Sequence, residues 1–178
     1  MEIISILMIG VGLSMDAFSL SLGYGVLNFT ETKRRIVALT VGLFHFFMPL
    51  LGMFFGDLLE HYILIDIRYI VFIIFMILGV EMSYSTIKKE KSIILLSGLG
   101  LLLFSFTVSI DSFSAGIGIK FISNSYLLCS FIFSLTSLVF TYYGLKIGSF
   151  IGLKYKETSK LIGGLILGAF ALFYLFKY

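Results

Sequence analysis

Six long apolar segments constrain the fold of this chain more than any other feature of its sequence. A helix needs about 20 consecutive apolar residues to cross a bilayer, and each segment reaches or nearly reaches that length. The connections between the segments are short. The sequence therefore predicts an all-α polytopic membrane protein with six transmembrane helices in a single membrane domain, residues 1–178. The segments cover residues 3–26, 36–55, 69–87, 93–119, 121–145 and 161–176.

The composition agrees with this prediction and argues against several other classes of protein. Hydrophobic residues make up 59% of the 178 residues and charged residues 13%, whereas ordinary soluble domains are about 25% charged. The net charge of +3 is too small to indicate a nucleic-acid partner. Cys129 is the one cysteine, so we expect neither a disulfide framework nor a thiolate metal cluster. The sequence carries no Walker motif, and we expect neither an enzyme nor a bound cofactor.

Lysine and arginine are distributed unevenly over the two sides of the predicted bundle. Ten of the 13 follow the first, third or fifth segment, while the opposite side holds Arg68, Lys120 and Lys177. Loops rich in Lys and Arg remain in the cytoplasm. We therefore predict a multi-pass protein of the bacterial cell membrane with both termini outside the cytoplasm.

One stretch of the first segment occurs a second time in the fourth segment. Residues 12–23 read GLSMDAFSLSLG and residues 107–118 read TVSIDSFSAGIG. Ser, Asp, Phe, Ser and Gly therefore recur in register at a separation of 95 residues. The duplication indicates that the chain consists of two related halves.

The repeat extends into the second segment of each half. Glycines 52 and 56 match glycines 144 and 148. Each half contains three segments, an odd number, so the second half must cross the membrane in the opposite sense. We predict two inverted three-helix repeats, residues 1–90 and 91–178, an arrangement typical of transporters that bind their substrate near the midplane.

Asp16 and Asp111 are the leading candidates for a functional site. A carboxylate inside a bilayer is costly, so it marks a functional position by default. A stripe of small residues for close helix packing would explain the neighbouring Gly and Ser but not two carboxylates. Two facing carboxylates repel each other unless they share a cation or a proton, and oxygen ligands suit hard divalent ions such as Mn²⁺ or Mg²⁺. We predict that hydroxyls of Ser19, Thr107 and Ser114 complete this metal site.

His45 is a further candidate ligand, four residues before the only proline, Pro49. A lone histidine in an apolar segment is either a hydrogen-bonded interior residue or a ligand or proton-transfer group, and both interpretations stay open. Glu81, close to the end of the third segment, either reaches water or contributes to the site. We include Glu81, Ser14 and Ser109 as accessory candidates.

At these residues the sequence resembles the MntP-type manganese efflux pump family, a distant relative of the lysine-exporter superfamily. The likeness covers essentially the whole chain, and its motifs are residues 12–19, 42–52 and 109–118. The resemblance implies six transmembrane helices, export of Mn²⁺ from the cytoplasm, two essential span aspartates and a polar residue at the position of His45. Glu81 departs from the family pattern, in which a basic or other non-acidic residue is expected.

Three hypotheses for the function remain open. The first is a secondary exporter of Mn²⁺ or a similar divalent cation. The second is a non-transporting membrane protein of the same family, of the sporulation-linked type, in which the aspartates join helices. The third is an exporter of another small cation or of an amino acid. The expected partners are the cation and the lipid bilayer but no nucleic acid, and a homo-oligomer is one option.

Overall fold

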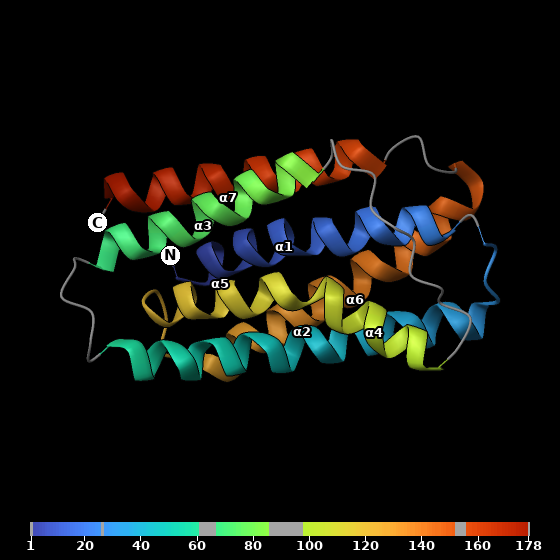
Figure 1. Ribbon diagram of the computed structural model, residues 1–178, viewed down its shortest axis with the longest axis horizontal. Helices are drawn as coiled ribbons and strands as arrows, with labels where there is room; N and C mark the ends of the chain where they lie inside the picture. Colours follow the sequence, from blue (N-terminus) through green and yellow to red (C-terminus); the bar gives the residue numbers. More distant parts are fainter. Residues whose placement is uncertain (1, 26, 61–66, 86–97, 152–155, 178) are drawn as a thin grey trace.

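In lipid, an apolar segment can satisfy its backbone hydrogen bonds internally only as a helix or in a closed barrel. The computed structural model describes residues 2–25, 27–60, 67–85, 98–151 and 156–177, and within these ranges it is helical, with no strand. The helices are α1 (Glu2–Gly25), α2 (Glu31–Glu60), α3 (Ile67–Ser85), α4 (Gly98–Val108), α5 (Ile110–Lys120), α6 (Tyr126–Ile151) and α7 (Lys156–Lys177) (Figure 1).

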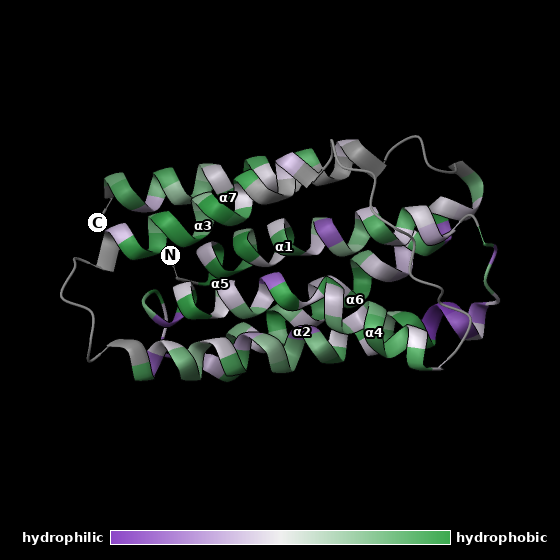
Figure 2. Cartoon of the chain, in the orientation of Figure 1, coloured by the Kyte–Doolittle hydropathy of each residue, from purple (hydrophilic) through white to green (hydrophobic). Residues whose placement is uncertain are grey.

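The predicted all-helical fold is confirmed for this part of the chain, and its apolar helices are consistent with a membrane protein. Four described spans are long and apolar enough to cross a membrane, and α3 and α7 contain shorter apolar segments. Figure 2 shows apolar residues along all of the helices, with hydrophilic residues mainly at helix ends and at isolated points within α1 and α5. The four long spans are Ile3–Gly25, Glu31–Leu58, Gly98–Lys120 and Tyr126–Phe150.

The fourth span is interrupted, whereas the sequence predicted one helix over residues 93–119. Ser109 separates α4 from α5. Its hydroxyl donates a hydrogen bond of 2.7 Å to the carbonyl oxygen of Ser105, which is the acceptor that its own N–H would use in a regular helix. The N–H of Ser109 instead donates to Phe106, at 3.1 Å. This exchange of partners breaks the helix two residues before Asp111.

The start of α6 also differs from the prediction, because turn chemistry rather than hydropathy determines it. The predicted span began at residue 121, but α6 begins at Tyr126. The hydroxyl of Ser123 accepts a hydrogen bond from the N–H of Ser125, and the carbonyl of Ser125 accepts the N–H of Cys129. Serine side chains that bond to nearby backbone groups favour turns and helix starts.

The start of α2 lies before the predicted start at residue 36. Glu31 forms ion pairs of 3.2 Å with both Arg34 and Arg35 in the first turns of the helix. Such charged turns are helical without being apolar, so a hydropathy criterion excludes them. Two predicted boundaries lie outside the described residues. They are the end of the third span near residue 87 and the start of the fourth span at residue 93.

Both chain termini lie at the same end of the bundle (Figure 1), which we call the terminal end. The opposite end carries the first turns of α2 with Lys33, Arg34 and Arg35, and we call it the basic end. Tyr142, near the end of α6, donates a hydrogen bond of 2.7 Å to Glu31 and ties α6 to α2 there. An even number of crossings returns the chain to the side on which it began.

Two helix pairs run parallel and in close contact, α1 with α6 and α2 with α5. On α6, a methyl group added to Gly144 would lie 2.8 Å from the carbonyl oxygen of Phe18 on α1. On α2, a methyl group added to Gly52 would meet the carbonyl oxygen of Phe113 on α5. Glycine is required at these two positions because the facing backbone leaves no room for a side chain.

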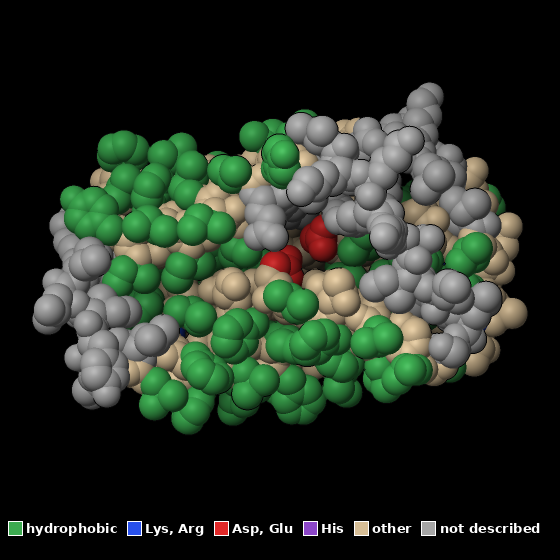
Figure 3. All heavy atoms as spheres, viewed as in Figure 1, with side chains coloured by type: hydrophobic (Ala, Val, Ile, Leu, Met, Phe, Trp, Pro, Cys, Tyr) green, Lys and Arg blue, Asp and Glu red, His purple; other side chains and the backbone are tan. Residues whose placement is uncertain are grey.

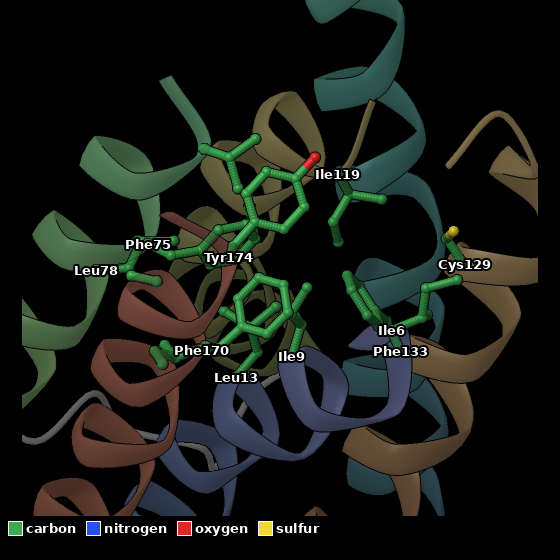
Figure 4. Close-up of a cluster of buried hydrophobic side chains, with 14 of the residues drawn as sticks. Ile6, Ile9, Leu13, Phe75, Leu78, Ile119, Cys129, Phe133, Phe170 and Tyr174 are labelled. Carbon is green, nitrogen blue, oxygen red and sulfur yellow. The ribbon is translucent and has the colours of Figure 1, made fainter. Parts of the chain in front are cut away.

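The terminal half of the bundle is filled by a large apolar cluster. Its side chains come from α1, α2, α3, α5, α6 and α7, and Figure 4 shows how the labelled ones point toward one another. The rings of Phe75 and Phe170 stack edge to face with centroids 5.2 Å apart. Most of its members are less than 2% exposed. We call it the terminal plug, and its labelled members are Ile6, Ile9, Leu13, Phe75, Leu78, Ile119, Cys129, Phe133, Phe170 and Tyr174.

Candidate metal site

Acidic side chains lie in a hollow of the face shown in Figure 3, over the middle of α1 and the start of α5. Apolar side chains cover most of the described surface around them. The acidic residues that the sequence places at these points are Asp16 on α1 and Asp111 on α5, and both are half-buried. The two helices are also in direct contact. The hollow therefore offers negative charge within an otherwise apolar part of the molecule.

The break at Ser109 changes the surroundings of Asp111. Because α5 begins at Ile110, Asp111 lies in the first turn of a helix rather than in the interior of one. The N–H of Ser112 donates a hydrogen bond of 2.8 Å to its Oδ1. The first turn of a helix carries free N–H groups and a partial positive charge, which stabilise a carboxylate. The second carboxylate oxygen is then oriented by a fixed backbone.

His45 is fully buried in the middle of α2. Its Nδ1 lies 3.0 Å from the carbonyl oxygen of Val41 and 2.9 Å from the hydroxyl of Ser109. Its Nε2 has no hydrogen-bond partner within the described part of the chain. Pro49, one turn later, has no N–H to donate to the carbonyl oxygen of His45. His45 is thus the residue that links α2 to the break before Asp111.

Ser14 on α1 corresponds to Ser109 in the repeat, and it likewise lies two residues before an aspartate, Asp16. Its hydroxyl donates to the carbonyl oxygen of Gly10 at 2.6 Å and lies 3.1 Å from the hydroxyl of Ser137 on α6. Both serines are buried. α1 stays helical at this point, although Ser14 makes the same backbone contact as Ser109 does in the fourth span.

The other predicted site residues lie in different environments. Ser19 is buried on α1, and Ser114 is half-buried on α5. Thr107 is exposed on α4, and its hydroxyl donates to Leu103 of its own helix at 2.8 Å. The break at Ser109 separates Thr107 from Asp111, so their spacing of four residues no longer places them one turn apart on a regular helix. Glu81 belongs to α3, but its side chain lies outside the described part of the structure.

The arrangement provides oxygen ligands more readily than nitrogen or sulfur ligands. Among the described residues, no group of three or more His, Cys, Asp and Glu side chains is close enough to hold a metal ion. The hollow offers the carboxylate oxygens of Asp16 and Asp111 together with hydroxyl and backbone oxygens of the same helices. Hard divalent cations accept such a ligand set.

Ser137, like Ser112, is a buried polar residue near this site that the sequence prediction missed. Gly52 and Gly144 correspond at a separation of 92 residues, and the same separation carries His45 onto Ser137. The repeat could therefore have identified Ser137 from the sequence. The role of Ser137 depends on its contact with Ser14, which the sequence alone does not reveal.

Comparison with known proteins places these features in a family context. Residues 28–175 match the model of a family described as "Mntp: Putative manganese efflux pump". The chain is similar to proteins named "Putative manganese efflux pump MntP" from Bacillus pumilus (34% identity), Geobacillus kaustophilus (36%) and Oceanobacillus iheyensis (33%). These matches cover 98%, 98% and 99% of this chain and 96%, 96% and 97% of the relatives. No solved structure matches the chain.

Proposed function

This chain belongs to the Mntp family, and on that premise we propose that it exports Mn²⁺ from the cytoplasm as a secondary transporter. The relatives are named putative manganese efflux pumps, and the chain matches them over nearly their full length. The observation that carries the proposal is the pair of acidic residues, Asp16 and Asp111, on two touching apolar helices. Acidic residues inside a membrane are rare and costly, and they mark ion pathways and binding sites by default.

In this proposal, Asp16 and Asp111 share one divalent cation near the midplane of the membrane. The first turn of α5 holds Asp111 in place through Ser112. Ser19 and Ser114 offer hydroxyl oxygens from the same two helices, and water supplies the remaining ligands. Mn²⁺ accepts a site that mixes carboxylate, hydroxyl and water oxygens. His45 Nε2, buried without a described partner, is a nitrogen that the described part of the site could add.

The chain consists, in the same proposal, of two inverted three-helix repeats, residues 1–90 and 91–178. Reciprocal contacts support this. Gly144 faces the carbonyl of Phe18, and Gly52 faces the carbonyl of Phe113. In the repeat Gly52 corresponds to Gly144 and Phe18 to Phe113, so the two contacts are equivalent. A methyl group added to Gly42 would lie 3.2 Å from the carbonyl oxygen of Ser134, which is the counterpart of Gly42 itself. A two-fold relation between the halves would produce all three contacts.

The terminal plug suggests how access to the cation site is controlled. It closes the terminal half of the bundle with fully buried rings such as Phe75, Phe133 and Phe170. Transport across the membrane requires that this half opens after the cation has bound, while the basic half closes. Rocking of one repeat against the other would achieve both changes around a fixed site.

The orientation follows from the charges at the two ends. Lys33, Arg34 and Arg35 gather at the basic end, which we assign to the cytoplasm, and both termini then lie outside. Mn²⁺ enters the site from the basic end and leaves through the terminal end. The lipid bilayer surrounds the apolar outer surface seen in Figure 3.

A membrane protein without transport activity is the main alternative, and the charge of Asp16 distinguishes the two. Asp16→Asn keeps the size and hydrogen bonding of the side chain, so a purely structural role would survive it. Binding of a divalent cation would not, because one of the two compensating charges is lost.

The test is to measure the metal content of cells. Bacteria lacking their own manganese exporter would express the chain or its Asp16→Asn variant under Mn²⁺ load, and mass spectrometry would give the cellular Mn, Mg, Fe and Zn content. We expect the native chain to lower Mn selectively, and the variant to leave it unchanged at equal amounts in the membrane fraction. Unchanged Mn with folded native protein in the membrane would contradict the proposal.

A further inference from the structure

Two pairs of buried polar side chains occupy corresponding places in the two halves of the molecule. Ser14 on α1 lies 3.1 Å from Ser137 on α6, and Ser109 before α5 lies 2.9 Å from His45 on α2. Ser14 and Ser109 are 95 residues apart, and His45 and Ser137 are 92 apart, as in the repeated motifs. All four residues are fully buried.

The hydroxyl protons fix the direction of these contacts. Ser14 and Ser109 each donate to the carbonyl four residues earlier, at 2.6 and 2.7 Å. A serine hydroxyl has one proton, so in each pair the partner must be the donor. Ser137 therefore donates to the oxygen of Ser14. The one proton on Nδ1 of His45 is shared between the carbonyl oxygen of Val41, at 3.0 Å, and the oxygen of Ser109, at 2.9 Å. In both halves, the second span supplies a hydrogen bond to the first span of the other half.

The two serines each precede an aspartate by two residues. In a helix two residues correspond to a rotation of about 200°, so Ser14 and Asp16 leave α1 on nearly opposite sides. Ser14 consequently cannot reach a cation that Asp16 binds directly. What the contact with Ser137 can do is hold the rotation and height of α1 at this level, and with them the direction of Asp16.

We propose that Ser137 and His45 are positioning residues for the two aspartates. Ser137 acts on Asp16 through Ser14, and His45 acts on Asp111 through Ser109. This inference rests on the proposed function for the identity of the cation, but the contacts themselves do not depend on it. In this proposal His45 positions Asp111 through its Nδ1 atom, and Ser137 becomes part of the support of the site.

Ser130 provides the matched control. It lies on α6, like Ser137, and is equally buried. Its hydroxyl has no hydrogen-bond partner among the described residues. Ser130→Ala and Ser137→Ala therefore remove the same atom from the same helix, but only Ser137→Ala removes a contact with α1.

The first measurement is Mn²⁺ binding to the purified full chain in lipid nanodiscs, with free Mn²⁺ read by electron paramagnetic resonance. Loss of one buried hydrogen bond should weaken binding about five- to tenfold in Ser137→Ala and in Ser14→Ala. The double variant, Ser14→Ala with Ser137→Ala, should bind Mn²⁺ no more weakly than the poorer of the two single variants, because both substitutions remove the same contact. Ser137→Thr should bind like the native chain, and so should Ser130→Ala. Weakened binding in Ser14→Ala alone would make Ser14 a ligand and overturn the proposal.

The second measurement reads the position of residue 16 without any metal. Asp16→Cys, in a Cys129→Ser background, would be labelled with a small cationic methanethiosulfonate, and its rate measured with and without Ser137→Ala. We expect the rate to change at least threefold with Ser137→Ala and to stay unchanged with Ser130→Ala. Equal rates in all three proteins would overturn the positioning role. A changed rate in a protein whose native form binds no Mn²⁺ would support positioning and contradict the proposed function instead.

Discussion

The hydroxyl of Ser109 lies 2.9 Å from Nδ1 of His45, and this contact joins the break in the fourth span to the middle of α2. Farther along the same two helices, a methyl group added to Gly116 would lie 2.5 Å from the carbonyl oxygen of Pro49. α2 and α5 are therefore held together both by a polar contact and by close backbone packing. Asp111 lies between these two points, so its position depends on both.

Replacement of His45 tests the polar contact. His45→Leu keeps a similar volume but removes the donor to Ser109, and we expect Mn²⁺ export to fall about tenfold, as for the loss of a buried hydrogen bond with an unsatisfied partner. His45→Gln can still donate from its amide and should keep most of the activity. Transport of Mn²⁺ into inverted membrane vesicles measures both. Equal activity of His45→Leu and the native chain would exclude a role for this contact.

Replacement of a glycine tests the packing contact. Gly116→Ala places a methyl group against the backbone of Pro49, and we expect a loss of about 1–3 kcal/mol in the free energy of unfolding. Gly168→Ala is the control, since nothing lies within 4 Å of the added methyl group. It should be neutral or stabilising by up to about 1 kcal/mol, because alanine favours helix. Cys129 is buried, so a thiol-reactive dye reports thermal unfolding in detergent. Equal melting temperatures would contradict the close approach.

The sequence predicted the helical membrane fold well, because lipid allows few alternatives for long apolar segments. It did not predict the break at Ser109. Ser14 donates to the carbonyl four residues earlier in the same way, yet α1 continues without interruption. Local sequence is thus insufficient, and the surroundings of each serine decide whether the helix breaks. This is also why the role of Ser137 could not be predicted from its position alone.

The helix ends show a second limit of the sequence prediction. Hydropathy located the apolar middle of α2 and of α6 but not the polar turns at which these helices begin. Glu31 extends α2 through its arginine pairs, and Ser123 and Ser125 delay the start of α6. For the candidate site, the repeated motif identified Asp16 and Asp111, because acidic residues are rare in apolar segments. Their hydrogen-bond partners come from other helices, and only the fold brings these together.

A polar contact at the terminal end should contribute more to stability than its counterpart at the basic end. The hydroxyl of Tyr126 lies 2.7 and 2.8 Å from the two oxygens of Asp57 and shares its one proton between them, and Lys120 pairs with the same carboxylate at 2.7 Å. The contact of Tyr126 with Asp57 is part-buried, whereas the contact of Tyr142 with Glu31 is exposed. The two carboxylates are 38% and 44% exposed, so the difference comes mainly from Lys120, whose side chain is 12% exposed.

We therefore expect Tyr126→Phe to lower the free energy of unfolding by about 1–2 kcal/mol and Tyr142→Phe by less than about 1 kcal/mol. Thermal unfolding of both variants in the same detergent measures the difference. A larger effect of Tyr142→Phe would show that burial does not determine the strength of these contacts.

The proposed orientation can be tested by labelling of single cysteines in intact cells. In a Cys129→Ser background, Asn124→Cys places a thiol at the terminal end and Thr32→Cys places one at the basic end, and both positions are exposed. A membrane-impermeant maleimide should label position 124 and leave position 32 unlabelled until the cells are opened. Labelling of position 32 from outside would reverse the orientation and, with it, the direction of transport.

The two aspartates should act as one unit. Each compensates part of the charge of a shared cation, and loss of one partner of a buried ionic contact costs about 3–5 kcal/mol. We therefore expect Asp16→Asn and Asp111→Asn each to reduce Mn²⁺ transport by about 100-fold or more. The double variant should be no worse than either single one, because the site is already lost. Glu31→Gln makes the same carboxylate-to-amide change at the exposed basic end and should leave transport intact. Transport retained in either single variant, with the protein folded in the membrane, would show that the two carboxylates do not share a cation.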